Sequence, residues 1–198
     1  MHAATSSRYG QRVCAASWCP DGDYLAVGGI NPIYAAGGFN NTDQVRVYKF
    51  VNNALSPEVS VALGSSSAEL YSIAWHPSGR YIALGCYNSE AIGGFLAGVN
   101  LRIYSFDGAI LTPIVGYDFG SATRTPAGMH WSPDGKYLAV GTCDGRPTSA
   151  PATGNGLRIF EFQNDNSLVS RATWNTSGAV LSVNWEFDNR FKIGRAHV

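Results

Sequence analysis

Three near-copies of one motif constrain the fold of this chain more than any other feature. Each copy reads Trp-x-Pro-(Asp/Ser)-Gly-x-Tyr-(Leu/Ile)-Ala-(Val/Leu)-Gly, at Trp18–Gly28, Trp75–Gly85 and Trp131–Gly141. Trp185 and Phe191 begin a weaker fourth copy, so the tryptophans at positions 18, 75, 131 and 185 are spaced by 57, 56 and 54 residues. A nearly fixed period of this size predicts an array of similar modules.

Each module reads as four short strands. In the first module, successive side chains of Val13–Trp18 would point to opposite sides, and both sides carry small or apolar residues. This pattern is expected for a strand buried between two sheets. Pro20-Asp21-Gly22 predicts a tight turn, and Tyr24–Gly28 then predicts a returning second strand. A third strand is expected at Val45–Phe50 and a fourth near Val59–Leu63. The same order recurs in the next two modules, and no stretch has convincing helical periodicity.

The sequence therefore predicts an all-β fold: a β-propeller of four-stranded antiparallel blades, with about three and a half blades in an incomplete ring. The expected boundaries are an interblade connector or truncated start at 1–12, blade 1 at 13–63, blade 2 at 64–119, blade 3 at 120–174, the start of blade 4 at 175–192, and 193–198 outside the repeat. Residues 193–198 resemble the translation of a sequencing-library adaptor, so we exclude them from fold reasoning.

The motif copies resemble the WD40-repeat β-propeller family over residues 13 to about 192. The second element of the resemblance is a set of (Val/Leu)-Arg-(Val/Ile)-(Tyr/Phe)-x-Phe copies in the third strands, which begin at Val45, Leu101 and Leu157. Two departures indicate a divergent branch: the Gly-His pair that opens many family repeats is absent, and the Trp-Asp pair that ends the third strand is replaced. The resemblance implies a rigid platform for contacts with other proteins.

Charge and composition exclude several function classes. The chain has 14 acidic and 14 basic residues in 198, so nothing favours binding to nucleic acid or to an acidic membrane surface. The four cysteines lack metal-ligand spacing, and we expect neither a metal nor another cofactor. The first ten residues lack the apolar core of a signal peptide, and no run is long enough to span a membrane. These features predict a soluble, cytoplasmic protein, although Met1 could be an internal residue of a longer chain.

The loops between second and third strands are the places where binding residues are expected. They span 17, 16 and 16 positions, from Gly28 to Val45, Gly85 to Leu101 and Gly141 to Leu157, whereas a hairpin needs about 2–5 residues. Strand order places these loops on one face together with the interblade connectors. The predicted partner-binding residues are Ile33, Tyr34, Phe39, Tyr87, Phe95, Leu96 and Arg146. The alternative is that the apolar members fold back over the blade ends.

No catalytic constellation is found in the sequence, and we name no catalytic residue. The phosphate loop with Gly-Lys-Ser/Thr, the Gly-x-Ser-x-Gly elbow and the His-Glu-x-x-His motif are absent. His76 and His130 are interpreted as turn and strand residues because neither has a carboxylate partner at a repeated position. Arg46, Arg102 and Arg158 recur in every third strand, which favours a structural role over a binding surface.

The first functional hypothesis is a non-catalytic propeller that serves as a protein-protein interaction scaffold. The alternative is a propeller segment of an enzyme, either associated with a hydrolase or with an active site at the central opening. A secreted or surface repeat protein is a third, weaker hypothesis. With only three and a half blades the ring cannot close, so we also expect the isolated chain to self-associate through its open blade ends.

Overall fold

The computed structural model describes residues 12–30, 43–63, 68–87, 94–121, 123–147, 156–186 and 191–194. Within these ranges the regular elements are β-strands, and no helix there could span a membrane. The strands are β1 (Arg12–Trp18), β2 (Tyr24–Ile30), β3 (Asp43–Val51), β4 (Ala54–Ala62), β5 (Glu69–Trp75), β6 (Tyr81–Tyr87), β7 (Leu101–Phe106), β8 (Leu111–Tyr117), β9 (Arg124–Trp131), β10 (Tyr137–Asp144), β11 (Leu157–Phe162), β12 (Leu168–Trp174), β13 (Ser182–Trp185) and β14 (Phe191–Gly194).

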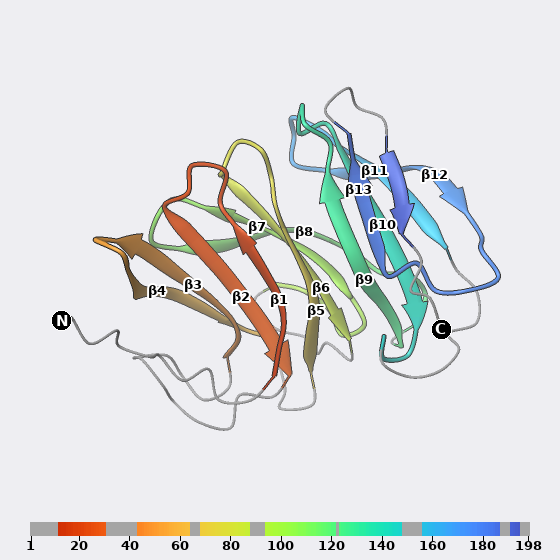
Figure 1. Ribbon diagram of the computed structural model, residues 1–198. Coiled ribbons are helices and arrows are strands. Elements are labelled where there is room, and N and C mark those ends of the chain that lie inside the picture. The colour runs from red at the N-terminus through yellow and green to blue at the C-terminus, as the bar shows by residue number, and fades with distance from the viewer. Residues whose placement is uncertain are drawn as a thin grey trace.

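The strands form antiparallel blades in chain order. β1–β4, β5–β8 and β9–β12 each make a four-stranded sheet, and β13 pairs with β14. A single bridge between Ile30 and Glu69 joins the first two sheets at their edges. The sheets stand side by side, with the first strand of each blade next to the first strand of the following blade (Figure 1). The predicted all-β, incomplete propeller is confirmed, and we call β1, β5, β9 and β13 the inner strands.

The motif forms the hairpin between the first and second strands of each blade, as predicted. Its glycines, Gly22, Gly79 and Gly135, have φ values of 81°, 71° and 74°, a left-handed conformation that a side chain would strain. Each glycine N–H donates to the carbonyl three residues earlier, for example from Gly135 to Ser132 at 2.8 Å. The repeated sequence therefore forms the turn between the first two strands of each blade.

Strand lengths differ from the sequence expectation at several places. β4 begins at Ala54, five residues before the expected Val59, because Asn52 and Asn53 make a two-residue turn with φ values of 52° and 61°. β6 and β10 also continue past the last glycine of the motif, as far as Tyr87 and Asp144. β14 includes residues 193 and 194, which the repeat pattern excludes, and pairs them with β13.

Neighbouring blades are joined by the indole of each repeated tryptophan after the first. The indole N–H donates to the backbone carbonyl of the residue that precedes the tryptophan in the previous blade. The bonds are Trp75 to Ser17 at 3.0 Å, Trp131 to Ala74 at 3.1 Å and Trp185 to His130 at 3.0 Å. The same contact at each of these blade junctions explains why tryptophan, an aromatic residue with one fixed donor, recurs here.

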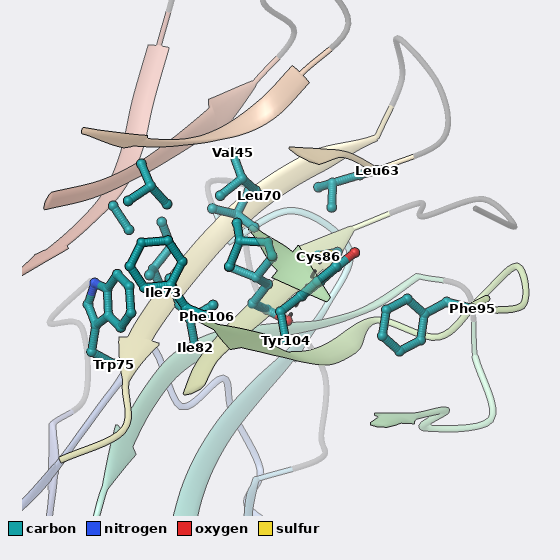
Figure 2. Close-up of a cluster of buried hydrophobic side chains, with 14 of the residues drawn as sticks. Val45, Leu63, Leu70, Ile73, Trp75, Ile82, Cys86, Phe95, Tyr104 and Phe106 are labelled. Atoms are coloured by element: carbon teal, nitrogen blue, oxygen red, sulfur yellow. Dashed lines mark hydrogen bonds between the residues drawn. The ribbon is translucent and has the colours of Figure 1, made fainter. Parts of the chain in front are cut away.

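Aromatic rings fill the space between the blades. Trp75 stacks edge-on against Phe106 at 5.4 Å, and Tyr24 of the previous blade covers the same phenyl ring at 4.9 Å. Figure 2 shows this core, in which Val45 of blade 1 lies opposite Leu70 of blade 2. Both residues are fully buried, so the core belongs to the junction between two sheets.

The last glycine of the motif leaves room for the following blade. A Cβ atom at Gly85 would lie 2.4 Å from the carbonyl oxygen of Pro126, on the inner strand of blade 3. At Gly141 the corresponding distance, to the carbonyl oxygen of Val180, is 2.5 Å. Backbone atoms cannot move aside as a flexible side chain can, so these glycines permit close stacking of the sheets.

We predict that Gly85→Ala lowers the free energy of unfolding by roughly 1–3 kcal/mol, the usual cost of overpacking a core. Urea denaturation followed by circular dichroism measures this effect. Gly178→Ala is the matched control because the methyl group of the new alanine would meet nothing within 4 Å, so its stability should change by less than about 0.5 kcal/mol. Equal effects of the two substitutions would contradict the close-stacking explanation.

Candidate functional site

The predicted partner-binding residues fall into separate groups. Ile33, Tyr34 and Phe39 lie outside the described residues. Of the others, Phe95 is only 8% exposed and packs edge-on against Tyr104 at 5.4 Å, so it covers the end of its blade.

Leu96, the next residue, is 74% exposed. The last two residues of the set come together, because the Arg146 guanidinium lies over the Tyr87 ring at 5.4 Å. Partner binding by these residues stays a prediction.

Arg146 belongs to a polar cluster where inner strand β5 begins. Its Nε lies 3.1 and 2.9 Å from the two carboxylate oxygens of Glu69, and its Nη2 lies 2.8 Å from Oε1. The Glu69 side chain is 6% exposed, whereas that of Arg146 is 50% exposed. This bidentate geometry fixes the guanidinium plane and raises the pKa of Arg146, mainly through the hydrogen bond to Glu69. A cation is thus held in one orientation at the surface.

Tyr71 completes the cluster from the same strand. Register shifts between Leu70 and Ser72 place Tyr71 in a β-bulge, which turns its side chain out of the regular alternation. Its hydroxyl donates to Glu69 Oε2 at 2.6 Å. Burial, followed by this hydrogen bond, raises the pKa of Tyr71, so the phenol keeps its proton at neutral pH. We call Glu69, Tyr71, Tyr87 and Arg146 the mouth cluster.

The equivalent position in blade 3 carries different chemistry. Glu69 pairs across the sheet with Tyr87, whereas Arg124, at the start of β9, pairs with Asp144. Arg124 Nε lies 3.2 Å from Asp144 Oδ1, and these side chains are 20% and 33% exposed. Charged groups therefore line the long-loop ends of two adjacent inner strands. Their identity varies between blades, which is expected for a functional surface and not for a repeated structural contact.

Only part of this cluster was predicted from the sequence. Tyr87 and Arg146 were predicted because they lie in long loops or at their edges, whereas Glu69 and Tyr71 were missed. A usable signal existed, because Glu69 is an acidic residue at the start of a strand whose residues are all buried. Burial of a carboxylate requires a partner, and the partner is 77 residues away in the sequence.

The third-strand arginines make structural contacts: Arg46 and Arg102 are fully buried, whereas Arg158 is partly buried. Arg102 is fully buried, donates from Nε to the Val99 carbonyl at 2.9 Å, and lies over Phe95 at 5.0 Å. Arg158 reaches the previous blade, where its guanidinium lies over Tyr117 at 5.2 Å and over Phe119 at 5.4 Å. These arginines fasten loops and blades together.

The two candidate histidines are also interblade residues. His76 Nε2 lies 3.0 Å from the Gly135 carbonyl of the next blade, and Nδ1 accepts from the Ser78 backbone N–H at 3.0 Å. His130 Nδ1 accepts from the backbone N–H of Trp185 at 3.1 Å. Burial lowers the pKa of both imidazoles. Neither histidine faces the mouth cluster, so neither is placed to act there.

Two hollows occur on the turn face, opposite the long loops. One, of about 520 Å³, lies between Tyr24 and Arg80, and the other, of about 630 Å³, lies between Tyr81 and Lys136. Their linings occupy equivalent positions in successive blades, so these hollows are a consequence of blade stacking and not a specific site. The described residues include no cluster of His, Cys, Asp and Glu suited to a metal ion.

A family model for the WD domain, G-beta repeat, matches residues 123–146, which contain the β9–β10 hairpin. The fold is that of an incomplete WD40-like propeller. Repeats of this family commonly mediate contacts with other proteins. A comparison with curated protein sequences finds no match.

Two solved structures share the fold at low sequence identity. One, assigned as a 6-phosphogluconolactonase from Bacteroides uniformis, has a TM-score of 0.62 and 16% identity over 92% of this WD40-like chain. The other, given the same assignment and from Bacteroides fragilis, has a TM-score of 0.56 and 18% identity over 94% of the chain. The chain spans 47% and 43% of their respective lengths, less than half of each.

This comparison corrects one expectation. We predicted that the chain is not an enzyme, and both similar propellers are assigned as enzymes of the same kind. The prediction was wrong because it rested on the absence of catalytic motifs made of residues that are close together in the sequence. In a propeller, groups that meet at the inner strands come from different blades, as Glu69 and Arg146 do. Such an arrangement leaves no local signature in the sequence.

The two interblade histidines, His76 and His130, predict a pH dependence of stability. Their folded-state pKa values lie below the ordinary value of 6.5, so the unfolded chain binds more protons in mildly acidic solution. The stability contribution of these histidines is therefore lost progressively as the pH falls through the ordinary value of about 6.5 toward 5. Urea denaturation at several pH values measures this fall.

His76→Gln should reduce the loss of stability between pH 7 and pH 5. Carboxyl groups with lowered pKa values, such as those of Asp134 and Glu161, lose their stabilising effect only at lower pH, below the ordinary values of 3.8 and 4.5. The window from pH 5 to 7 thus separates the two contributions. A loss of stability that is the same in wild type and His76→Gln would contradict the assignment to His76.

Proposed function

We propose that this chain is part of a propeller enzyme that hydrolyses a phosphorylated sugar lactone at the mouth cluster. The observation that carries the proposal is the guanidinium of Arg146, half-exposed and fixed in orientation by the buried Glu69 at the start of an inner strand. The two solved structures with the same fold, both assigned as 6-phosphogluconolactonases, support this choice of substrate class. The lactonase part of the proposal rests on fold likeness at 16–18% identity.

The chemistry of the reaction defines what the cluster must supply. Water adds to the lactone carbonyl carbon, and negative charge develops on the carbonyl oxygen. The bond between this carbon and the ring oxygen then breaks. Of the two protons of the water, one goes to the ring oxygen and the other is released to solvent, which leaves a hydroxyl group and a carboxylate. Donors that are already oriented toward the developing charge give the largest single stabilisation in reactions of this kind. Arg146 can supply such donors, or it can bind the phosphate of the substrate.

The other residues of the cluster have positioning roles in this proposal. Glu69 accepts two hydrogen bonds from Arg146, so its carboxylate holds the guanidinium in place. Tyr71 keeps its proton and donates it in a hydrogen bond to Glu69 Oε2, which fixes the carboxylate in turn. The Tyr87 ring supports the guanidinium from one side, at 5.4 Å. A cation held in this way needs little reorganisation when an anion binds.

Protein binding is a second proposal, for the long-loop face as a whole. It is supported by the match to the WD domain, G-beta repeat model and by Leu96, which is 74% exposed on the loop between β6 and β7. An apolar side chain at that exposure is available for contact with a partner. The two proposals are compatible, because the mouth cluster and Leu96 are different groups on the same face.

Arg146→Ala should weaken binding of 6-phosphogluconate, the hydrolysis product, by roughly 10- to 100-fold, the usual effect of losing a hydrogen bond to a charged group. The full chain is titrated with this stable anion in isothermal calorimetry. Hydrolysis of the lactone above the uncatalysed rate, measured by proton release, should be reduced in the same variant by about 10²-fold or more.

Arg171→Ala is the matched control. Arg171 is also 50% exposed and also paired with a carboxylate, that of Glu161 at 2.5 Å, but it lies on the outermost strand of blade 3. Binding should therefore be unchanged in this variant. Failure of the wild-type chain to bind the anion, or equal losses in the two variants, would contradict the proposal.

A further inference from the structure

One face of blade 1 exposes residues that are covered in the other blades. Trp18 and Phe50 stack edge-on at 5.5 Å, and they are 48% and 38% exposed. Together with the turn glycine Gly22 they form what we call the open face, on the side of blade 1 away from blade 2. Pairs of the same kind occur in the next two blades, where Trp75 lies 5.4 Å from Phe106 and Trp131 lies 5.5 Å from Phe162.

In blade 2 the equivalent pair is buried by blade 1. Trp75 is 6% exposed and Phe106 is 7% exposed. Ser17 accepts the indole hydrogen bond at 3.0 Å, and Tyr24 covers the phenyl ring at 4.9 Å. The open face therefore repeats, position by position, the surface on which one blade receives the preceding one.

The turn glycines give an independent indication. A Cβ at Gly79 would lie 3.1 Å from Cys19 Sγ of the preceding blade, and one at Gly135 would lie 2.4 Å from His76 Nε2. A Cβ at Gly22 would meet nothing within 4 Å. All three positions that contact a preceding blade in blades 2 and 3 are thus uncovered in blade 1.

The other end of the chain carries the complementary half of this junction. Inner strand β13 is joined to β9 by the Trp185 indole bond to His130, like the junctions before it. Asn184 precedes Trp185 and holds the repeat position of Ser17, whose carbonyl accepts an indole hydrogen bond. Glu186 follows Trp185 and holds the position of Cys19, which contacts the turn glycine of the next blade. Asn184 is an exposed residue of β13.

We propose that the open face docks the β13 end of a second copy of this chain, head to tail. The Trp18 indole would donate to the Asn184 carbonyl of the second copy, and Glu186 of that copy would lie against Gly22. Continuity with three existing junctions of the same design supports this occupant. This proposal is independent of the catalytic one.

Analytical ultracentrifugation of the full chain over a range of concentrations tests the docking. The wild-type chain should associate reversibly into pairs, and Trp18→Ala should raise the dissociation constant by at least about 30-fold, as for a central aromatic residue of an interface. The control is Trp174→Ala, because Trp174 is 61% exposed but lies on the outermost strand of blade 3. Its dissociation constant should equal that of the wild type. A wild-type chain that stays monomeric, or equal losses in both variants, would overturn the proposal.

Cross-linking tests which ends meet. One preparation carries Asp23→Cys, beside the turn glycine of the open face, and the other carries Glu186→Cys at the β13 end. A short bis-maleimide should join two chains in the mixture of both variants and in neither variant alone. The wild type controls for Cys14, the partly exposed natural cysteine. Cross-links within either single preparation at the level of the mixture would exclude head-to-tail docking, even if the chain associates.

Discussion

The indole hydrogen bond between blades is the interaction on which the rest of the structure depends. Each of the first three blades is a four-stranded sheet with hydrophobic side chains on both faces, so it needs a sheet on either side. Apolar packing alone does not fix how far one sheet is shifted against the next. The indole N–H of Trp131 must reach the Ala74 carbonyl, and this requirement sets the register of two sheets. The close approach at Gly85 follows from that register.

The fixed register also explains how a functional cluster arises between blades. Glu69 begins the inner strand of blade 2, and Arg146 follows the second strand of blade 3, so they meet only when the sheets are correctly stacked. The scaffold residues repeat, whereas residues at the long-loop ends of the inner strands differ, with Glu69 in one blade and Arg124 in the next. The repeat therefore supplies rigidity, and its variable ends supply chemistry.

Much of the fold was predictable from the sequence, and the reasons are local. The turn at Pro133-Asp134-Gly135 requires a glycine with a positive φ value. Small or apolar residues on both sides of a segment indicate a strand that is buried on both faces. The order of the strands within each blade could therefore be predicted from residue patterns. The start of β4 at Ala54 was missed because two asparagines with positive φ form a tighter turn than expected. The site was predicted only in part. The pairing of Glu69 with Arg146 is a contact over 77 residues, and periodicity carries no information about it.

The most direct test of the interblade register is a comparison of Trp131→Phe with Trp174→Phe in urea denaturation. Phenylalanine keeps an aromatic ring but removes the indole donor, which leaves the buried Ala74 carbonyl without this partner. Trp131→Phe should lower the free energy of unfolding by roughly 1–3 kcal/mol, the cost of an unsatisfied buried polar group. Trp174→Phe, at a position 61% exposed, should change it by less than about 0.5 kcal/mol. Equal stability of the two variants would show that the register of the blades does not depend on the indole bond.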